Sequence, residues 1–319
     1  MKPALSIIFF TVSAGAGLGL LALITLVGLV APASLPPHAL WRGALLGLAL
    51  VAAGLAASVL HLANPRQAWR SFVRVRTSWL SREAVAAAAL FVVGAGYVLL
   101  VAEGYPGALR VLLAFATCIL AWVVQVCTAM IYASLKPIRQ WRTRWTPANY
   151  LLLGHWSGAL LLCALAGAYA PPRAAAFLTL ATILGFAALA AKLGYWQAIG
   201  GVAHAPTLER AIGVAEGVRG PGPVSVAHAR LLDTGHSHGT FLTNEFGFRV
   251  AQRHARVLRG AALALGFGLP LAWLVTGDTR WQPALAAAAC CIIGLLIERW
   301  LFFAEAKHTV RLYHGDPRT

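Results

Sequence analysis

The amino-acid sequence predicts an all-α integral membrane protein with eight transmembrane helices. Of its 319 residues, 59% are hydrophobic and 11% are charged, which is more apolar than a water-soluble domain of this length requires. The apolar residues gather in eight runs, each near the roughly 20 residues that an α-helix needs to cross a bilayer core. The predicted spans are 5–29, 43–63, 84–103, 109–134, 149–169, 175–198, 257–276 and 283–303.

The first run, 5–29, follows a single cation, Lys2. It is longer than the apolar core of a cleaved signal peptide, which has about 7–15 residues. The small residues Ala31-Pro32-Ala33 follow it, as they would at a cleavage site. Because of its length, we interpret this run as the first transmembrane helix rather than as a signal peptide.

The positive charges predict how the helices are oriented. Eight spans place both termini on one face, which carries 19 Lys or Arg residues, whereas the opposite face carries four: Arg42, Arg110, Arg173 and Arg280. Since Lys and Arg concentrate in cytoplasmic loops, the sequence predicts an N-in and C-in topology in the bacterial inner (cytoplasmic) membrane, with the basic face cytoplasmic. The same rule accounts for the net charge of +16 without nucleic-acid binding.

One connection, 199–256, is long and polar, and it is predicted to be cytoplasmic. It contains a Gly/Pro hinge at 220–223, followed by a helical stretch from about Asn244. It is too short to be an enzyme domain of its own, so we expect a docking loop for partner subunits. The two histidines of His236-Ser237-His238 lack a third metal ligand at a recognisable spacing, and docking is the better interpretation. The predicted docking residues are Arg230, His236, His238, Arg249 and Arg253.

Several classes of catalytic site are missing from the sequence. The five cysteines lie in apolar runs, without the paired spacing of a disulfide framework or a C-x-x-C metal site. No nucleophile elbow, phosphate-binding loop or metalloprotease motif is present. A haem site would need facing histidines within the membrane, a possibility that only the pair His61 and His155 leaves formally open. We therefore expect no haem, and no complete active site in this chain alone.

The densest group of functional side chains lies between the second and third spans. His61 ends an apolar run, Asn64-Pro65 interrupts the helix, and tryptophans and arginines follow: Trp69, Arg70, Arg76, Trp79 and Arg82. A quinone head group is a flat ring with two carbonyl oxygens, and it needs a hydrogen-bond donor or proton carrier at the lipid boundary, a role that His61 fits. The alternative is an interfacial belt of Trp and Arg with a helix-capping His, which the residues alone favour.

Some ionisable residues lie inside the predicted spans. His155 either has a functional role inside the bundle or makes an interhelical hydrogen bond, and the sequence leaves both readings open. Lys192 and the pair Glu298-Arg299 lie near span ends, where we expect them to extend toward the membrane surface and to be structural. A transporter would instead place charges at mid-depth in broken helices.

Several sequence strings in combination resemble one known family. The strings 61–65, 68–70 and 76–83 are similar to the HLG-x-P, AWR and RTSWLSRE strings of the dimethyl sulfoxide reductase anchor-subunit (DmsC-like) family. Two departures are Ala63, where the family has Gly, and Gln67, where it has Arg. The similarity continues through 132–136, 146–150, 230–233, 246–251 and 254–255, so that it covers most of the sequence.

This resemblance implies a haem-free, eight-helix, quinone-reactive anchor subunit of a heterotrimer. Its partners would be an iron–sulfur ferredoxin-like subunit and a molybdopterin catalytic subunit, so the molybdopterin and the iron–sulfur clusters would belong to the partners only. The cofactor of this chain would be a quinone, either ubiquinone or menaquinone. The predicted quinone site consists of His61, Asn64, Arg66, Trp69, Arg70, Arg76, Trp79 and His155.

The resemblance also implies a direction of electron flow. The stretch 230–243 looks similar to the sulfite-oxidising branch of the family, and the loops that would hold the partners are cytoplasmic by charge. We therefore expect the complex to be a sulfite dehydrogenase that reduces quinone. The alternatives are a quinol-oxidising anchor of a dimethyl sulfoxide or polysulfide-type reductase and, in another class, a membrane transporter without a redox role.

Overall fold

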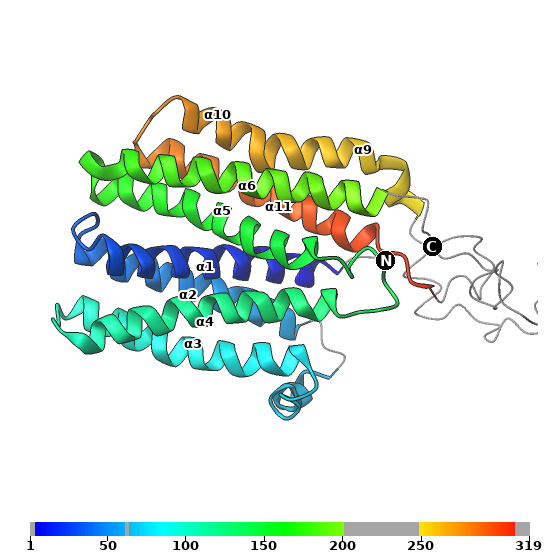
Figure 1. The fold of residues 1–319 in the computed structure, drawn as a ribbon, viewed down its shortest axis with the longest axis horizontal. Helices are drawn as coiled ribbons and strands as arrows, with labels where there is room; N and C mark the ends of the chain where they lie inside the picture. The colour runs from blue at the N-terminus through cyan, green and yellow to red at the C-terminus, as the bar shows by residue number, and fades with distance from the viewer. Residues whose placement is uncertain (1–3, 61–63, 201–248, 310–319) are drawn as a thin grey trace, which may run out of the picture.

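The computed structural model describes residues 4–60, 64–200 and 249–309, and in them it shows a bundle of long helices (Figure 1). Eight helical segments in this part of the sequence are long and apolar enough to cross a membrane, which confirms the predicted all-α architecture with eight long apolar helices. The α-helices are α1 (Leu5–Val30), α2 (Pro37–Val59), α3 (Trp79–Ala102), α4 (Ala108–Ala133), α5 (Trp145–Tyr169), α6 (Ala174–Gly200), α9 (Arg249–Leu263), α10 (Leu269–Val275) and α11 (Trp281–Ala304). Shorter elements are the 3₁₀ helices η1 (Pro65–Phe72) and η2 (Pro171–Arg173) and a π-helical turn, η5 (Ala264–Gly268).

Helices α2 and α3 begin several residues before the apolar runs that predicted them. Helix α2 begins at Pro37, and proline is favoured in the first turn because the N–H that it lacks would have no helical partner there. Helix α3 begins at Trp79, where the Ser78 hydroxyl caps the first turn by accepting the N–H of Ser81 at 3.4 Å. Hydropathy reports the lipid-facing middle of a helix, whereas caps and prolines set where the helix begins.

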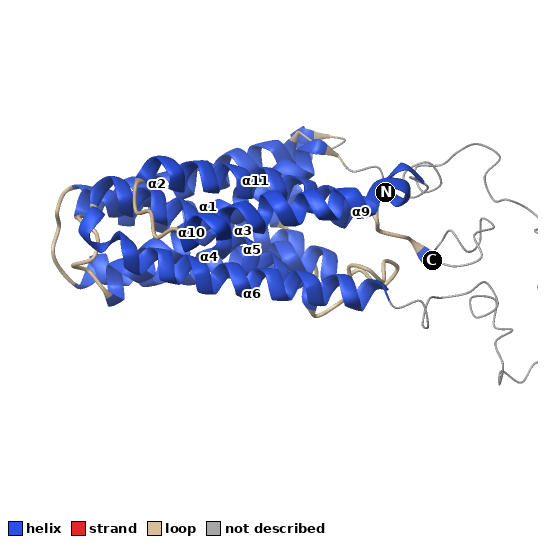
Figure 2. Ribbon diagram, turned by 90° about the horizontal axis from the view of Figure 1, so that it is seen from above, coloured by secondary structure: helices blue, strands red, loops and turns tan. Residues whose placement is uncertain are grey.

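Helix α1 lies at the centre of the bundle, packed against α2, α4 and α5 (Figures 1 and 2). Its most apolar 18-residue window is 83% buried, compared with 33% for α2 and α3. A helix that is apolar on all sides is buried in protein or in lipid. Here the N-terminal helix is the one that the others enclose.

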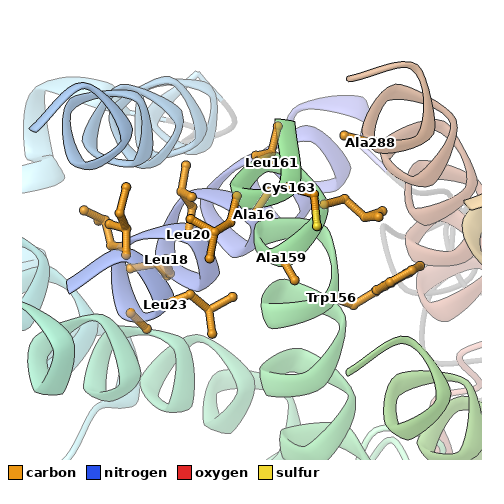
Figure 3. Close-up of a cluster of buried hydrophobic side chains, with 14 of the residues drawn as sticks. Ala16, Leu18, Leu20, Leu23, Trp156, Ala159, Leu161, Cys163 and Ala288 are labelled. Carbon is orange, nitrogen blue, oxygen red and sulfur yellow. The ribbon is translucent and has the colours of Figure 1, made fainter. Parts of the chain in front are cut away.

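Small residues let α1 approach α5 closely. A Cβ atom on Gly19 would lie 2.0 Å from the carbonyl oxygen of Gly154, and one on Gly158 would lie 2.4 Å from the backbone nitrogen of Leu20. Ala16, Leu18 and Leu20 of α1 belong to one buried apolar cluster with Trp156, Ala159 and Cys163 of α5 (Figure 3). Membrane helices gain association energy mainly from such close packing, because lipid tails are as apolar as the side chains.

The π-helical turn η5 occurs where a proline interrupts the last part of the seventh span. Pro270 has no N–H to donate to the carbonyl of Gly266, four residues earlier. The indole Nε1 of Trp156 in α5 donates to that carbonyl oxygen at 2.9 Å. Gly266 also meets Gly294 of α11 so closely that a Cβ on Gly294 would lie 2.1 Å from the Gly266 nitrogen. The irregular turn is therefore fixed by α5 and α11.

One end of the bundle holds the start of α1, the connections α2–α3 and α4–α5, and the end of α11 (Figure 1). The α4–α5 connection is fastened to the end of α11, because Trp141 Nε1 donates to the Phe302 carbonyl at 2.9 Å and Thr309 N donates to the Pro137 carbonyl at 3.0 Å. This is the arginine-rich end that the sequence predicts to be cytoplasmic. Its orientation in a membrane stays a prediction.

Candidate functional site

The segment between α2 and α3 carries most of the predicted quinone site. After Asn64, η1 forms a 3₁₀ helix that packs against α3. The side chain of Trp69 is 61% exposed, and Trp79 is half-buried at the start of α3. The predicted residues that are exposed are Asn64, Arg66, Trp69, Arg70 and Arg76. They lie on the surface of one segment, at one end of the bundle.

The turn between η1 and α3 is held in place by an arginine. Arg82 donates from Nε to the carbonyl of Val75 at 2.9 Å and from a terminal nitrogen to the carbonyl of Arg76 at 2.8 Å. Its guanidinium also lies 4.2 Å from the centre of the Trp79 ring, a cation–π distance. Arg82 thus fixes both the backbone of Arg76 and the plane of Trp79, two members of the predicted site.

His61, the central residue of that prediction, lies outside the described residues. The last described position before it is Leu60, directly after the end of α2. The role of His61 as a quinone ligand stays a prediction, and so do the roles of the exposed residues that follow it.

His155 lies in the third turn of α5 and makes an interhelical hydrogen bond. The indole Nε1 of Trp122 in α4 donates to His155 Nε2 at 2.8 Å, and His155 Nδ1 lies 2.8 Å from the Leu151 carbonyl oxygen. Since Nε2 accepts, the ring proton is on Nδ1, where it is donated to Leu151, and the ring is neutral. The sequence left open a functional role or an interhelical hydrogen bond for His155, and the structure shows the hydrogen bond. A contact of His155 with quinone stays a prediction.

The predicted docking residues fall mostly outside the described residues. Arg230, His236 and His238 lie in 201–248, and Arg249 and Arg253 occupy the first turns of α9. Further along α9, Arg259 forms an ion pair with Glu305 at 2.8 Å and lies 5.3 Å from the Trp196 ring of α6. Helices α6 and α9 lie on either side of the long connection in the sequence, and this contact joins both of them to the end of α11.

The structure reveals a buried ionic cluster that the sequence prediction placed wrongly. Lys192 of α6 and Glu298 of α11 form an ion pair, and each side chain is 1% exposed. Arg299 Nε lies 3.5 Å from the second carboxylate oxygen of Glu298. These side chains do not extend to the membrane surface as expected. They turn inward because an opposite charge on a neighbouring helix offsets part of the cost of burial.

Glu83 is a second buried carboxylic acid that the sequence prediction overlooked. It is 3% exposed in the second turn of α3, and the Thr128 hydroxyl of α4 donates a hydrogen bond to its Oε1. Buried Asp and Glu side chains of membrane helices are the kind of residue that carries protons, and Glu83 is of this kind. The short helix extension from Trp79 to Glu83, which the hydropathy of the third span does not include, is the feature that brings it inside.

The described residues include no cluster of three or more His, Cys, Asp or Glu side chains that could hold a metal ion. What the arrangement offers is a surface of arginine N–H donors and tryptophan planes at one end of the bundle, next to a buried acid. Arginine N–H groups suit carbonyl oxygens, and tryptophan planes suit flat rings. These donors and planes therefore have the chemistry that a quinone head group requires.

Comparison with known proteins identifies the family. The sequence matches the family described as DMSO reductase anchor subunit (DmsC) over residues 1–304. It is 34% identical to the C subunit of the sulfite dehydrogenase from Allochromatium vinosum over 333 aligned residues, covering 98% of this protein and 99% of that one. It is also 34% identical to the C component of the anaerobic dimethyl sulfoxide reductase from Escherichia coli over 122 residues, covering 37% and 42% of the two proteins.

No solved structure matches the protein. The family match nevertheless covers nearly the whole sequence and includes all eight long apolar helices. Together these findings confirm the predicted resemblance. The protein belongs to the DMSO reductase anchor subunit (DmsC) family, the membrane anchor subunits of DMSO reductase-family oxidoreductases.

Proposed function

We propose that this protein is the haem-free, quinone-reactive membrane subunit of a heterotrimeric molybdopterin oxidoreductase. It passes electrons from a partner iron–sulfur subunit to membrane quinone, and a molybdopterin partner obtains them by oxidising sulfite. One observation carries the proposal: the end-to-end similarity to the sulfite dehydrogenase subunit of Allochromatium vinosum, at 34% identity over 98% of this protein. The resemblance of 230–243 to the sulfite-oxidising branch supports the same substrate.

The partners dock on the arginine-rich end of the bundle, in the cytoplasm. The count of 19 cations on this face against four on the other supports the orientation. Arg249 and Arg253 begin α9 at this end, and the contact of Arg259 with Glu305 ties α9 to the end of α11. Arginines suit an acidic partner surface, through charge-assisted hydrogen bonds.

Quinone binds where the α2–α3 connection meets the lipid. A quinone supplies two-electron chemistry in which two carbonyl oxygens become hydroxyls. His61 donates to one carbonyl and exchanges a proton with water, because a histidine side chain can gain and lose a proton near neutral pH. Trp79 covers one face of the ring, held by Arg82 at 4.2 Å. Arginines of the segment 64–76 supply further N–H donors at the membrane surface.

A second candidate function is a quinol-oxidising anchor for a dimethyl sulfoxide or polysulfide-type reductase. The similarity to the dimethyl sulfoxide reductase component of Escherichia coli favours it, although that similarity covers 37% of this protein. A transporter without a redox role has less support. The buried charges Lys192 and Glu298 satisfy each other, whereas a transport site needs charges that are free to take a ligand.

Purification in mild detergent tests the proposal. The full-length protein, tagged and expressed in its native host, is extracted and the copurifying subunits are identified by mass spectrometry. We expect an iron–sulfur subunit and a molybdopterin subunit, and sulfite-dependent reduction of a short-chain quinone by the preparation. Recovery of the protein without redox subunits would refute the proposal. A complex that oxidises quinol with dimethyl sulfoxide, and does not oxidise sulfite, would establish the second candidate.

A further inference from the structure

A small cavity lies inside the bundle between α1, α5 and α11, and no function described above uses it. The centre of a water-sized sphere can move within about 10 Å³ of this cavity. One water molecule needs at least about this much space. The polar side chains that line the cavity are Thr11, Tyr150, Ser157 and Arg299.

Two of these side chains are hydrogen-bond donors without a sufficient acceptor. The hydroxyl of Tyr150 is buried and has no hydrogen-bond partner among the described residues. Arg299 is 4% exposed, and the central carbon of its guanidinium lies 3.9 Å from the centre of the Tyr150 ring. Its contact with the Glu298 carboxylate, at 3.5 Å, is longer than a hydrogen bond. Buried donors of this kind almost always have a partner, either protein or water.

The other two side chains can act as acceptors. The Thr11 hydroxyl donates its proton to the Ile8 carbonyl at 3.0 Å, and the Ser157 hydroxyl donates its own to the carbonyls of Leu153 and Gly154, both at 3.0 Å. Each oxygen therefore presents lone pairs to the cavity. An anion would meet these lone pairs unfavourably. A water molecule has two protons to donate to them and can accept from Tyr150 and Arg299.

We propose that this cavity binds one ordered water molecule, with Tyr150 and Arg299 as donors to it and Thr11 and Ser157 as acceptors from it. The site is built from side chains that are each at least 95% buried and that come from three helices. Apolar cavities of similar size stay dry, whereas cavities with two to four polar partners hold water. The water joins α1, α5 and α11 by hydrogen bonds, and it solvates a guanidinium that shares one carboxylate with Lys192.

The direct test is a cryo-electron microscopy map of the purified native complex, at a resolution that shows ordered water. We expect a density peak within about 3.2 Å of Tyr150 Oη and of an Arg299 nitrogen. In the same map for Tyr150→Phe, the peak should be lost or should move. An empty cavity in the parent protein, in a map that shows water elsewhere inside the bundle, would overturn the proposal.

Thermal unfolding of the complex tests the site without a map, because a wet and a dry cavity predict changes of opposite sign in the melting temperature of the variants. Gly15 lines the cavity, and a Cβ there would lie 3.9 Å from its nearest heavy atom, Gly154 Cα. Gly15→Ala therefore fits sterically and displaces the water. We expect the melting temperature to fall by roughly 2–4 °C, and Tyr150→Phe to act in the same direction.

The matched control is Gly260→Ala in α9, where an added Cβ meets no heavy atom within 4 Å. Alanine is the better helix former, so the control should melt at or above the parent temperature. In a dry cavity, Gly15→Ala would fill space and Tyr150→Phe would remove an unpaired hydroxyl, and both variants would melt at or above the parent temperature. That result would contradict the bound water.

Discussion

Lys192 of α6 and Glu298 of α11 form a fully buried ion pair, and the neighbouring Arg299 turns its guanidinium toward the same carboxylate, 3.5 Å away. Two cations thus share one anion inside an apolar bundle. Burial of an unpaired charge costs far more than a well-made pair contributes. Single substitutions of Glu298 and of Lys192 should therefore differ in how much they destabilise the protein, and this difference tests the arrangement.

We predict that Glu298→Gln destabilises the protein more than Lys192→Met. The first leaves two buried cations without an anion, at a cost of about 3–5 kcal/mol, whereas the second leaves Glu298 facing Arg299. The amount of protein retained in membranes and its melting temperature in detergent measure the difference. Equal effects, or a larger effect of Lys192→Met, would show that Arg299 does not share the carboxylate.

Trp156→Phe should weaken the contact between α5 and the π-helical turn. The substitution removes the indole N–H that bonds the Gly266 carbonyl at 2.9 Å and keeps an aromatic ring in place. The carbonyl is then buried without that donor, which costs about 1–3 kcal/mol. Protease sensitivity near the seventh span and thermal unfolding are the measurements. Trp281→Phe, at an exposed position, is the control and should change neither.

Stability near the end of α11 should depend on pH through Glu305, which lies outside the membrane-spanning segments. Burial raises the pKa of the Glu305 carboxyl above its ordinary value of 4.5, although Arg259 acts to lower it. The folded state therefore binds this proton more tightly than the unfolded state. The contribution to stability is present below about pH 4.5 and is lost as the pH rises through the raised pKa.

Glu305→Gln should flatten the pH dependence of unfolding in this window. Asp278→Asn is the control, since Asp278 lies at the other end of the bundle and the hydrogen bond from Arg280 lowers its pKa. Melting curves between pH 4 and 8 report the result. An unchanged pH profile in Glu305→Gln would mean that Glu305 is not the group responsible.

The start of α9 should be needed for docking. Replacement of Arg249 and Arg253 by Glu reverses the charge of a surface that we propose to meet acidic groups of the iron–sulfur subunit. We predict that the soluble subunits appear in the supernatant after membrane sedimentation. Arg110→Glu with Arg173→Glu, at the opposite end, is the matched control and should leave them on the membrane. Retention in the first variant would place docking elsewhere.

The fold was predictable from the sequence because few backbone structures are stable in the lipid core of a membrane. A segment in the bilayer must satisfy its own backbone hydrogen bonds, so apolar runs such as 109–134 and 283–303 report helices directly. The observed α4 and α11 differ from these runs by one or two residues at each end. The family was predictable for a different reason: the strings around Trp69 and Trp79 are specific in combination.

Contacts between helices could not be predicted in the same way. Nothing local to Lys192 indicates that Glu298, 106 positions later, faces it. A usable signal did exist, since opposite charges on two otherwise apolar spans indicate pairing more than separate exposure at the surface. Glu83 was missed because the hydropathy of the third span does not extend to the turn that Ser78 caps. The residues of the candidate site were thus proposed from the sequence, whereas the buried contacts of Lys192 and Glu83 were not.

The most direct measurement of the central claim is sulfite-dependent quinone reduction by the purified complex carrying His61→Ala. Loss of a positioned proton donor typically costs about 10²–10⁴-fold in rate, and we predict a decrease in that range. Reduction of an artificial soluble dye by the catalytic subunit and assembly of the complex should stay unchanged. His38→Ala, at the opposite end of α2, should behave like the parent. Full quinone activity in an assembled His61→Ala complex would contradict the account.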